Sequence, residues 1–223
     1  MTRFTLALGW VTAIASAAAT GCAVGEGEGS VKSDRLFVEG CWNGTFDLKP
    51  DFFAANPDNQ GDSLMLRLQR GDNIEEQSDG LLILVNQLSR VRKQLSDSGT
   101  GETTLKLGLP PGVRPPGVPV MANPDPPLVS LSLYLNKSCH AQNTTVYSTS
   151  GSITFRSLFS GDPQESSADA RLTDASFDAT VADPRLLAPS STHAPPDGVE
   201  VESHIAGDFR FYYQRGQPAQ PFQ

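Results

Sequence analysis

The chain of 223 residues is short of charge and of apolar side chains. Charged residues make up 19% and hydrophobic residues 38%, and both values are below the average of a soluble domain. Basic residues are fewer than acidic residues. The chain has 17 Lys and Arg and 25 Asp and Glu, which gives a net charge of −8. A chain this acidic, with no basic stripe, lacks the electrostatic footprint of a nucleic-acid-binding protein. Anionic lipid head groups would also repel it.

Long apolar runs are absent except at the start. The run over residues 4–19 follows the basic start Met1-Thr2-Arg3 and is rich in Ala, Thr and Ser. It is too short to span a bilayer core of about 30 Å. A short apolar run after a basic start is typical of a secretory signal peptide, so we predict one over residues 1–21.

The end of this segment has small residues directly before a cysteine. Residues Ala19-Thr20-Gly21-Cys22 resemble the lipobox of bacterial lipoproteins, although Ala19 stands where Leu is usual. The resemblance implies that Cys22 is acylated, with palmitate among the chains, and becomes the first residue of the mature protein. Two or three acyl chains on one residue anchor a protein stably. The alternative is ordinary cleavage after a small residue, which leaves a free thiol.

The residues after Cys22 predict a tether. Residues 23–30 alternate glycine with acidic and small side chains and have little to bury, so we predict a lipid-modified cysteine and flexible tether over residues 22–34. Ala23 rather than Asp follows the cysteine. By resemblance to the sorting rule of enteric bacteria, this implies anchoring in the outer membrane. The expected location is the bacterial cell envelope, on the periplasmic or surface face of that membrane.

Cysteine is scarce, and the number is odd. Three cysteines cannot all pair in disulfides within one exported chain. Acylation of Cys22 would leave only Cys41 and Cys139. Two thiols in an oxidising compartment suggest a disulfide, and this one would close a loop of about 100 residues. Two buried free thiols are the alternative.

Alternation of apolar and polar residues is the strongest structural pattern. It recurs in seven segments, at residues 42–49, 64–69, 104–109, 129–135, 152–156, 173–181 and 205–213. Strands with one polar, solvent-facing side and one apolar, buried side are typical of antiparallel sheets packed in two layers. We therefore predict an all-β domain over residues 35–214, a two-layer antiparallel β-sandwich of about eight or nine strands with at most one short helix. A polar C-terminal tail follows at residues 215–223.

Three other segments depart from this alternation. Residues 81–95 have helical spacing but begin with an apolar run, which favours a strand to about Asn86 and then a short helix. Eight prolines lie in residues 110–127, which predict a rigid crossover between sheets, with a polyproline-type ligand as the alternative. Residues 183–203 predict a second long loop.

Residues with catalytic or metal-binding chemistry are few. The three histidines, His140, His193 and His204, have no metal-ligand spacing. No Gly-x-Ser-x-Gly motif is present. Two acidic clusters offer oxygen ligands for calcium, Asn56–Asp62 and Asp162–Asp178, but the first lacks the closing glutamate of a calcium loop. We therefore predict no catalytic residue, no metal site and no cofactor.

Exposed aromatic side chains would indicate a sugar-binding site. Trp42 is the only tryptophan after the predicted signal peptide, and its alternation with Phe46 places it inward. Phe52 and Phe53 lie in a turn-rich stretch, where they either form a platform or cap the core.

Four stretches resemble a known group of sequences. They are Cys41–Pro50, Leu109–Val113, Leu158–Pro163 and Phe209–Pro218, and they are similar to uncharacterised lipoproteins of myxobacteria and their relatives. The resemblance covers most of the mature chain. It implies a location and no mechanism.

The sequence leads to one main functional expectation. We expect a non-enzymatic binding or scaffold module, held at the membrane by its N-terminal lipid, with an envelope protein or glycan as partner and no nucleic acid. The alternatives are a calcium-assisted or carbohydrate-binding module and, less favoured, a hydrolase.

Overall fold

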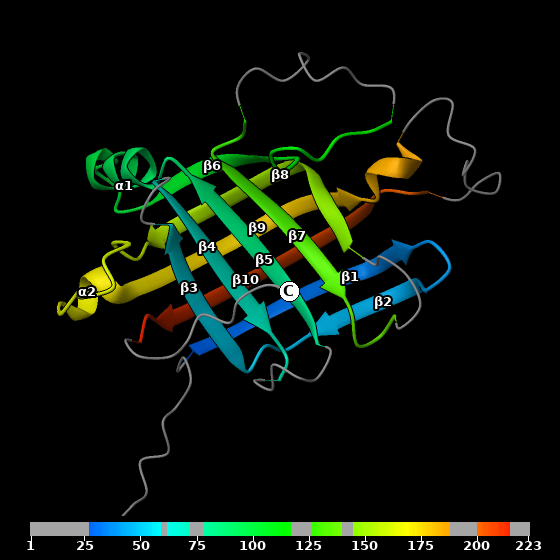
Figure 1. Ribbon diagram of the computed structural model, residues 1–223, viewed down its shortest axis with the longest axis horizontal. Helices are drawn as coiled ribbons and strands as arrows, with labels where there is room; N and C mark the ends of the chain where they lie inside the picture. The colour runs from blue at the N-terminus through cyan, green and yellow to red at the C-terminus, as the bar shows by residue number, and fades with distance from the viewer. Residues whose placement is uncertain are drawn as a thin grey trace, which may run out of the picture.

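The computed structural model describes residues 27–58, 62–71, 78–116, 126–139, 145–187 and 200–214 (Figure 1). The predicted signal peptide, Cys22 and the tail at residues 215–223 lie outside these ranges. The strands are β1 (Gly27–Val38), β2 (Trp42–Leu48), β3 (Phe52–Asp58), β4 (Ser63–Gln69), β5 (Asp79–Asn86), β6 (Thr103–Gly108), β7 (Val129–Leu135), β8 (Thr145–Ser157), β9 (Leu172–Ala182) and β10 (Ser203–Tyr212). The helices are α1 (Leu88–Asp97), the four-residue α2 (Ala168–Arg171) and the 3₁₀ turn η2 (Pro184–Leu186).

The ten described strands form one continuous sheet. Their order is β2-β1-β10-β9-β8-β6-β7-β5-β4-β3, and β7 also pairs with β8. All pairings are antiparallel except the short β6–β7 pairing, which is parallel. The sheet curls so that a front half (β3, β4, β5 and β7) lies across a rear half (β1, β2, β6, β8, β9 and β10) (Figure 1).

The all-β prediction is confirmed, but the predicted pair of separate sheets is not. The long strand β8 joins the two halves. Its first residues pair with β7, whereas residues 152–155 pair with β6. Between these parts the register shifts at Ser148/Ser150, and Gly151 has a φ of +120°. Bulges let one strand take part in two packed layers, so Ser150-Gly151 is a bend within a strand.

The core lies between the two halves of the curled sheet. Phe53 of β3 stacks on Phe211 of β10, with ring centroids 5.6 Å apart. Most inward residues of the strands from β4 to β10 are apolar and buried, and Ser148, Thr173 and Ser203 are buried polar exceptions. The two faces of the sheet are thus correctly predicted, although the number of sheets is not.

The predicted tether is wrong over residues 27–34, which form most of β1. Val31 is fully buried, and Gly27–Lys32 pair with β10. The glycines of this strand are packing residues, because a Cβ on Gly27 would lie 2.5 Å from the Cβ of Phe211. The glycines of this stretch suggested a flexible tether. In the folded chain they instead allow two strands to approach closely.

Residues 79–97 fold as predicted, with strand β5 followed by helix α1. Val91, which is fully buried, anchors the helix to the core. The limit of one short helix was wrong, because the single turn α2 is a second one. It buries no residue, so it has no apolar periodicity that a sequence pattern could detect. Of the predicted loop at residues 183–203, the part at residues 188–199 lies outside the described residues.

Two features hold the ends of the sheet together. The edge strands β2 and β3 are consecutive in the chain, so residues 49–51 cross from one edge of the sheet to the other. The predicted disulfide between Cys41 and Cys139 is confirmed, with a Cα–Cα distance of 5.7 Å. It connects the turn after β1 to the residues after β7, and so links the rear half to the front half.

Candidate functional site

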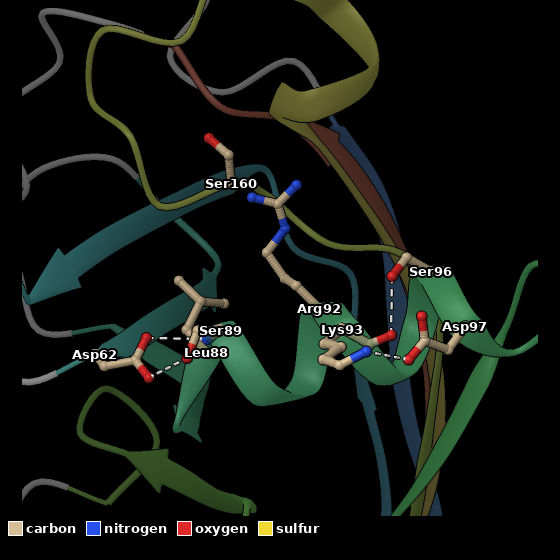
Figure 2. Close-up of a pocket in the computed structure, with 8 residues that line it drawn as sticks. All are labelled: Asp62, Leu88, Ser89, Arg92, Lys93, Ser96, Asp97 and Ser160. Atoms are coloured by element: carbon tan, nitrogen blue, oxygen red, sulfur yellow. Dashed lines mark hydrogen bonds and ion pairs between the residues drawn. The ribbon is translucent and has the colours of Figure 1, made fainter.

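A polar pocket of about 480 Å³ opens beside helix α1 (Figure 2). The helix forms one wall, and the segment after β8 and the residue before β4 complete it. The lining residues are Asp62, Leu88, Ser89, Arg92, Lys93, Ser96, Asp97 and Ser160.

Asp62 fixes the start of the helix that forms the wall. Its backbone oxygen accepts a hydrogen bond from the Leu88 amide at 2.8 Å. Its carboxylate accepts from the Ser89 amide at 2.9 Å and from the Ser89 hydroxyl at 2.6 Å. The residue directly before the helix, Gln87, makes no side-chain cap. An aspartate distant in sequence therefore satisfies the free amides of the first turn.

The segment on the other side of the pocket is held in place by packing. Phe159 is fully buried and stacks on Tyr213, with ring centroids 4.1 Å apart. The Ser160 amide donates to the backbone oxygen of Ala170 at 2.8 Å. Gly161 has a φ of +82°, and a Cβ there would lie 2.6 Å from the Leu88 side chain. The segment and the helix are thus in close contact.

The charges of the pocket do not all have partners. Lys93 forms an ion pair with Asp97 at 2.6 Å. Asp62 is committed to Ser89. Arg92 is half-buried and makes no ion pair or hydrogen bond within the described part of the chain. Figure 2 shows its side chain rising from the helix toward Ser160.

A second candidate is the outer surface of the rear half, which we call the polar face. It consists of the outward residues of β1, β6, β8, β9 and β10, and the members that matter here are Ser30, Lys32, Thr104, Lys106, Ser152, Thr154, Arg156, Asp174, Ser176, Asp178, His204, Asp208 and Arg210. Alternation along each strand places all of them opposite the buried core residues.

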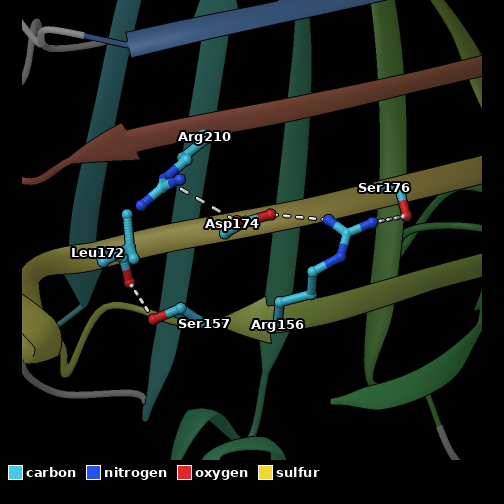
Figure 3. A network of polar contacts seen from close by, with 6 residues as sticks. All are labelled: Arg156, Ser157, Leu172, Asp174, Ser176 and Arg210. Carbon is cyan, nitrogen blue, oxygen red and sulfur yellow. Dashed lines mark hydrogen bonds and ion pairs between the residues drawn. The ribbon is translucent and has the colours of Figure 1, made fainter. Parts of the chain in front are cut away.

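Hydrogen bonds and ion pairs order this face (Figure 3). Asp174 accepts from Arg156 at 2.7 Å and lies 4.0 Å from the Nε of Arg210. Arg156 also donates to the Ser176 hydroxyl at 3.1 Å. The groups come from β8, β9 and β10, so one network spans three neighbouring strands.

The same pattern continues across the rest of the polar face. The Ser30 hydroxyl donates to Asp208 at 2.9 Å, and the Thr104 and Thr154 hydroxyls lie 2.8 Å apart. One aromatic ring joins the face, because Tyr212 at the end of β10 is 38% exposed. The alternation at residues 205–213 places Tyr212 on the outward side of the strand, as observed, but the sequence did not single it out as an aromatic platform.

Among the described residues, His204 and the aromatic residues singled out in the sequence lie in separate places. His204 lies on the polar face and contacts Asp178 at 2.9 Å, with both side chains largely exposed. His140 and His193 lie outside the described residues. Phe52 and Phe53 are buried and cap the core, while Trp42 is half-buried and packs edge-on against Phe46.

The two acidic clusters are dispersed into local contacts. In the first, Asp62 caps α1. In the second, Asp162 accepts from the Gln164 amide, and Asp174 and Asp178 pair with basic side chains of the polar face. Among the described residues, no group of three or more His, Cys, Asp or Glu side chains is arranged to hold a metal ion. The described helices also include none that is long and apolar enough to cross a membrane.

Sequence reasoning placed Arg92 on a helix but did not detect the pocket. The other wall comes from residues some 70 positions later, and no local pattern reports such a meeting. Comparison of the chain with protein-family models, curated proteins and solved structures gives no match.

Proposed function

We propose that the protein is a cell-envelope lipoprotein that acts as a tethered, non-enzymatic binding or scaffold module. Its anchor is an acyl group on Cys22, and its partner is a polar component of the envelope, a protein or a glycan. The resemblance to lipoproteins of myxobacteria supports this location.

The ordered polar face is the observation that carries this proposal. Side chains that are already held by Arg156–Asp174–Arg210 and Ser30–Asp208 contacts lose little rotamer freedom when a partner binds. The five hydrogen-bonded strands beneath them form a rigid support, on which binding groups are positioned more precisely than on loops. The curled all-β sheet, with its two facing halves, is the scaffold that carries this face.

Two further observations support an envelope location. The Cys41–Cys139 disulfide is typical of proteins that fold in an oxidising compartment. The five residues from Cys22 to Gly27, at about 3.5 Å each, reach at most about 18 Å. A lipid on Cys22 would therefore keep the start of β1, and with it the domain, close to the membrane surface.

Acylation is tested by the substitution Cys22→Ser. The wild-type protein should fractionate with the membrane and need detergent, whereas the variant should be recovered in the soluble fraction because it has lost its anchor. Recovery of the wild-type protein without detergent would show that Cys22 is not acylated.

The polar face is tested by site-specific photo-crosslinking of the full-length protein in intact cells. A photoreactive residue at Ser176 or Asp208 should give the same defined envelope adduct, and Arg210→Glu should abolish it. Met65, which faces outward on the front half, is the control position and should not give this adduct. Equal adducts from Met65 and Ser176, or none from either position, would contradict the proposal.

A glycan partner is the second candidate, and exposed Tyr212 favours it. An aromatic ring next to arginine, carboxylate and hydroxyl groups can stack on a sugar while its neighbours bind the sugar hydroxyls. Tyr212→Ala should then weaken binding of purified cell-wall glycan about tenfold, whereas Lys106→Ala at the far side of the face should leave it unchanged. Equal binding by wild type and Tyr212→Ala would exclude this partner.

A further inference from the structure

We propose that the pocket beside α1 binds an oxyanion, a phosphate or carboxylate group, through the guanidinium of Arg92 and the hydroxyl of Ser160. This site lies apart from the polar face and does not depend on the function proposed for it.

The charges that line the pocket leave one cation available. Of the four charged lining residues, Lys93 and Asp97 neutralise each other at 2.6 Å, and Asp62 accepts two hydrogen bonds from Ser89. Arg92 alone among them has no partner in the described part of the chain. A half-buried guanidinium has lost part of its hydration, so an anionic ligand that restores its hydrogen bonds is favoured.

The hydroxyl groups that line the pocket also differ in whether their protons are already donated in a hydrogen bond. The Ser89 proton is donated to Asp62, and the Ser96 proton is donated to the backbone oxygen of Lys93. Ser160 instead accepts a hydrogen bond from the Asp162 amide at 3.1 Å, so its own proton is free to donate. Arg92 and Ser160 together therefore supply donors to the pocket, while the Asp62 carboxylate is held by its two bonds to Ser89 at the start of the helix.

The pocket is also built before a ligand arrives. Packing of Phe159 on Tyr213 and of Gly161 on Leu88 fixes the Ser160 segment, and the buried Val91 fixes the helix from which Arg92 rises. The planar guanidinium matches the geometry of phosphate and carboxylate oxygens, which the compact ammonium of Lys93 does not. The start of α1 is not part of the site, since Asp62 already occupies its free amides.

The experiment titrates full-length protein in detergent with inorganic phosphate, and in a second arm with acetate. Sodium chloride keeps the ionic strength constant, and binding is followed by calorimetry and by the thermal midpoint. At least one of the two anions should bind and raise the midpoint by several degrees, and the comparison identifies which oxyanion is preferred. The proposal would be overturned if neither anion binds at concentrations up to about 50 mM, with the anion in at least about 100-fold excess over the protein.

Variants on the same helix give the matched comparison. Arg92→Gln should weaken anion binding at least tenfold, and Ser160→Ala should weaken it less. Arg90→Gln is the control, because Arg90 is exposed and bonded to Gln87, outside the pocket lining. If Arg92→Gln does not fold, Arg92→Lys keeps the charge but loses the planar fork and should bind several-fold more weakly. Wild-type affinity in Arg92→Lys and Ser160→Ala, or equal losses in Arg90→Gln and Arg92→Gln, would contradict the assignment.

Discussion

Gly207 lies where neighbouring elements leave no room for a side chain. A Cβ at this position in β10 would lie 2.2 Å from the backbone oxygen of Ser30 and 2.7 Å from the ring of Phe177. The ring could shift, but the backbone of the paired strand β1 cannot move without disturbing the ladder. At the residue scale, this glycine therefore sets how closely β1 and β10 pack.

We expect Gly207→Ala to lower the free energy of unfolding by about 1–3 kcal/mol, the range for overpacking a well-packed site. The measurement is the urea midpoint. Ala206→Ser is the control, because its side chain faces outward on the adjacent position of β10, and its midpoint should stay close to the wild-type value. A wild-type midpoint for Gly207→Ala would show that the two strands can separate easily.

Tyr134 is the residue whose protonation links pH to stability. Burial raises the pKa of its phenol from 10.0 to about 12, and its hydroxyl donates to Gln69 Oε1 at 3.0 Å. The unfolded chain loses this proton near pH 10 and the folded chain near pH 12. The stabilisation is therefore fully present below pH 10 and is lost as the pH rises toward 12.

Absorbance of tyrosinate should accordingly show one of the four tyrosines ionising near pH 12. Tyr134→Phe should be about 1 kcal/mol less stable than wild type at pH 8, because it leaves the buried Gln69 oxygen without its donor. The difference should shrink between pH 10 and 12. A difference that stays constant over this pH range would show that Tyr134 titrates normally.

At the scale of elements, helix α1 depends on a residue outside it. Asp62→Ala removes the bonds to Ser89 and should lower the free energy of unfolding by about 1–2 kcal/mol. Asp97→Ala is a matched control, since Asp97 lines the same pocket but forms only an exposed ion pair, worth less than about 1 kcal/mol. Denaturation with urea measures both, and equal effects would contradict the capping role of Asp62.

Local patterns predicted most elements but not their partners. Alternation correctly placed the buried faces of β7 and β9, and helical spacing after Asn86 correctly placed α1. The wrong tether at residues 27–34 has a clear cause, because Gly27 was interpreted by its intrinsic flexibility. In the folded chain Gly27 is required by close contact with Phe211, just as Gly151 is required by close contact with the Asp178 backbone. Such contacts are formed by distant residues and leave no local pattern.

At the scale of the whole molecule, the disulfide between Cys41 and Cys139 connects the two halves of the sheet. In the chain-entropy model, a closed loop of this length contributes up to about 4–5 kcal/mol. Reduction should therefore lower the urea midpoint substantially. The double variant Cys41→Ser/Cys139→Ser should have the lower midpoint at once and should not respond to reductant, and an equal midpoint for oxidised and reduced wild type would show that the bond is not stabilising.

The candidate sites follow the same distinction between local and distant information. The disulfide could be inferred from cysteine parity, because only two cysteines remain when Cys22 is acylated. The pocket beside α1 could not, since it requires Asp62, Arg92 and Ser160 to meet from three separate segments. The polar face is intermediate, because alternation predicted outward polar residues and only the strand order shows which of them are neighbours.

The first and last strands of the described chain are neighbours, and Gly27 lies opposite Phe211. The beginning of β1 and the end of β10 therefore share one corner of the molecule. A short linker from Gln214 to Gly27 would make a circular permutant, and new ends between Lys49 and Pro50 would open the chain where it crosses between the two sheet edges. The same proximity means that a fluorescent protein fused directly after Gln214 would emerge beside the start of β1.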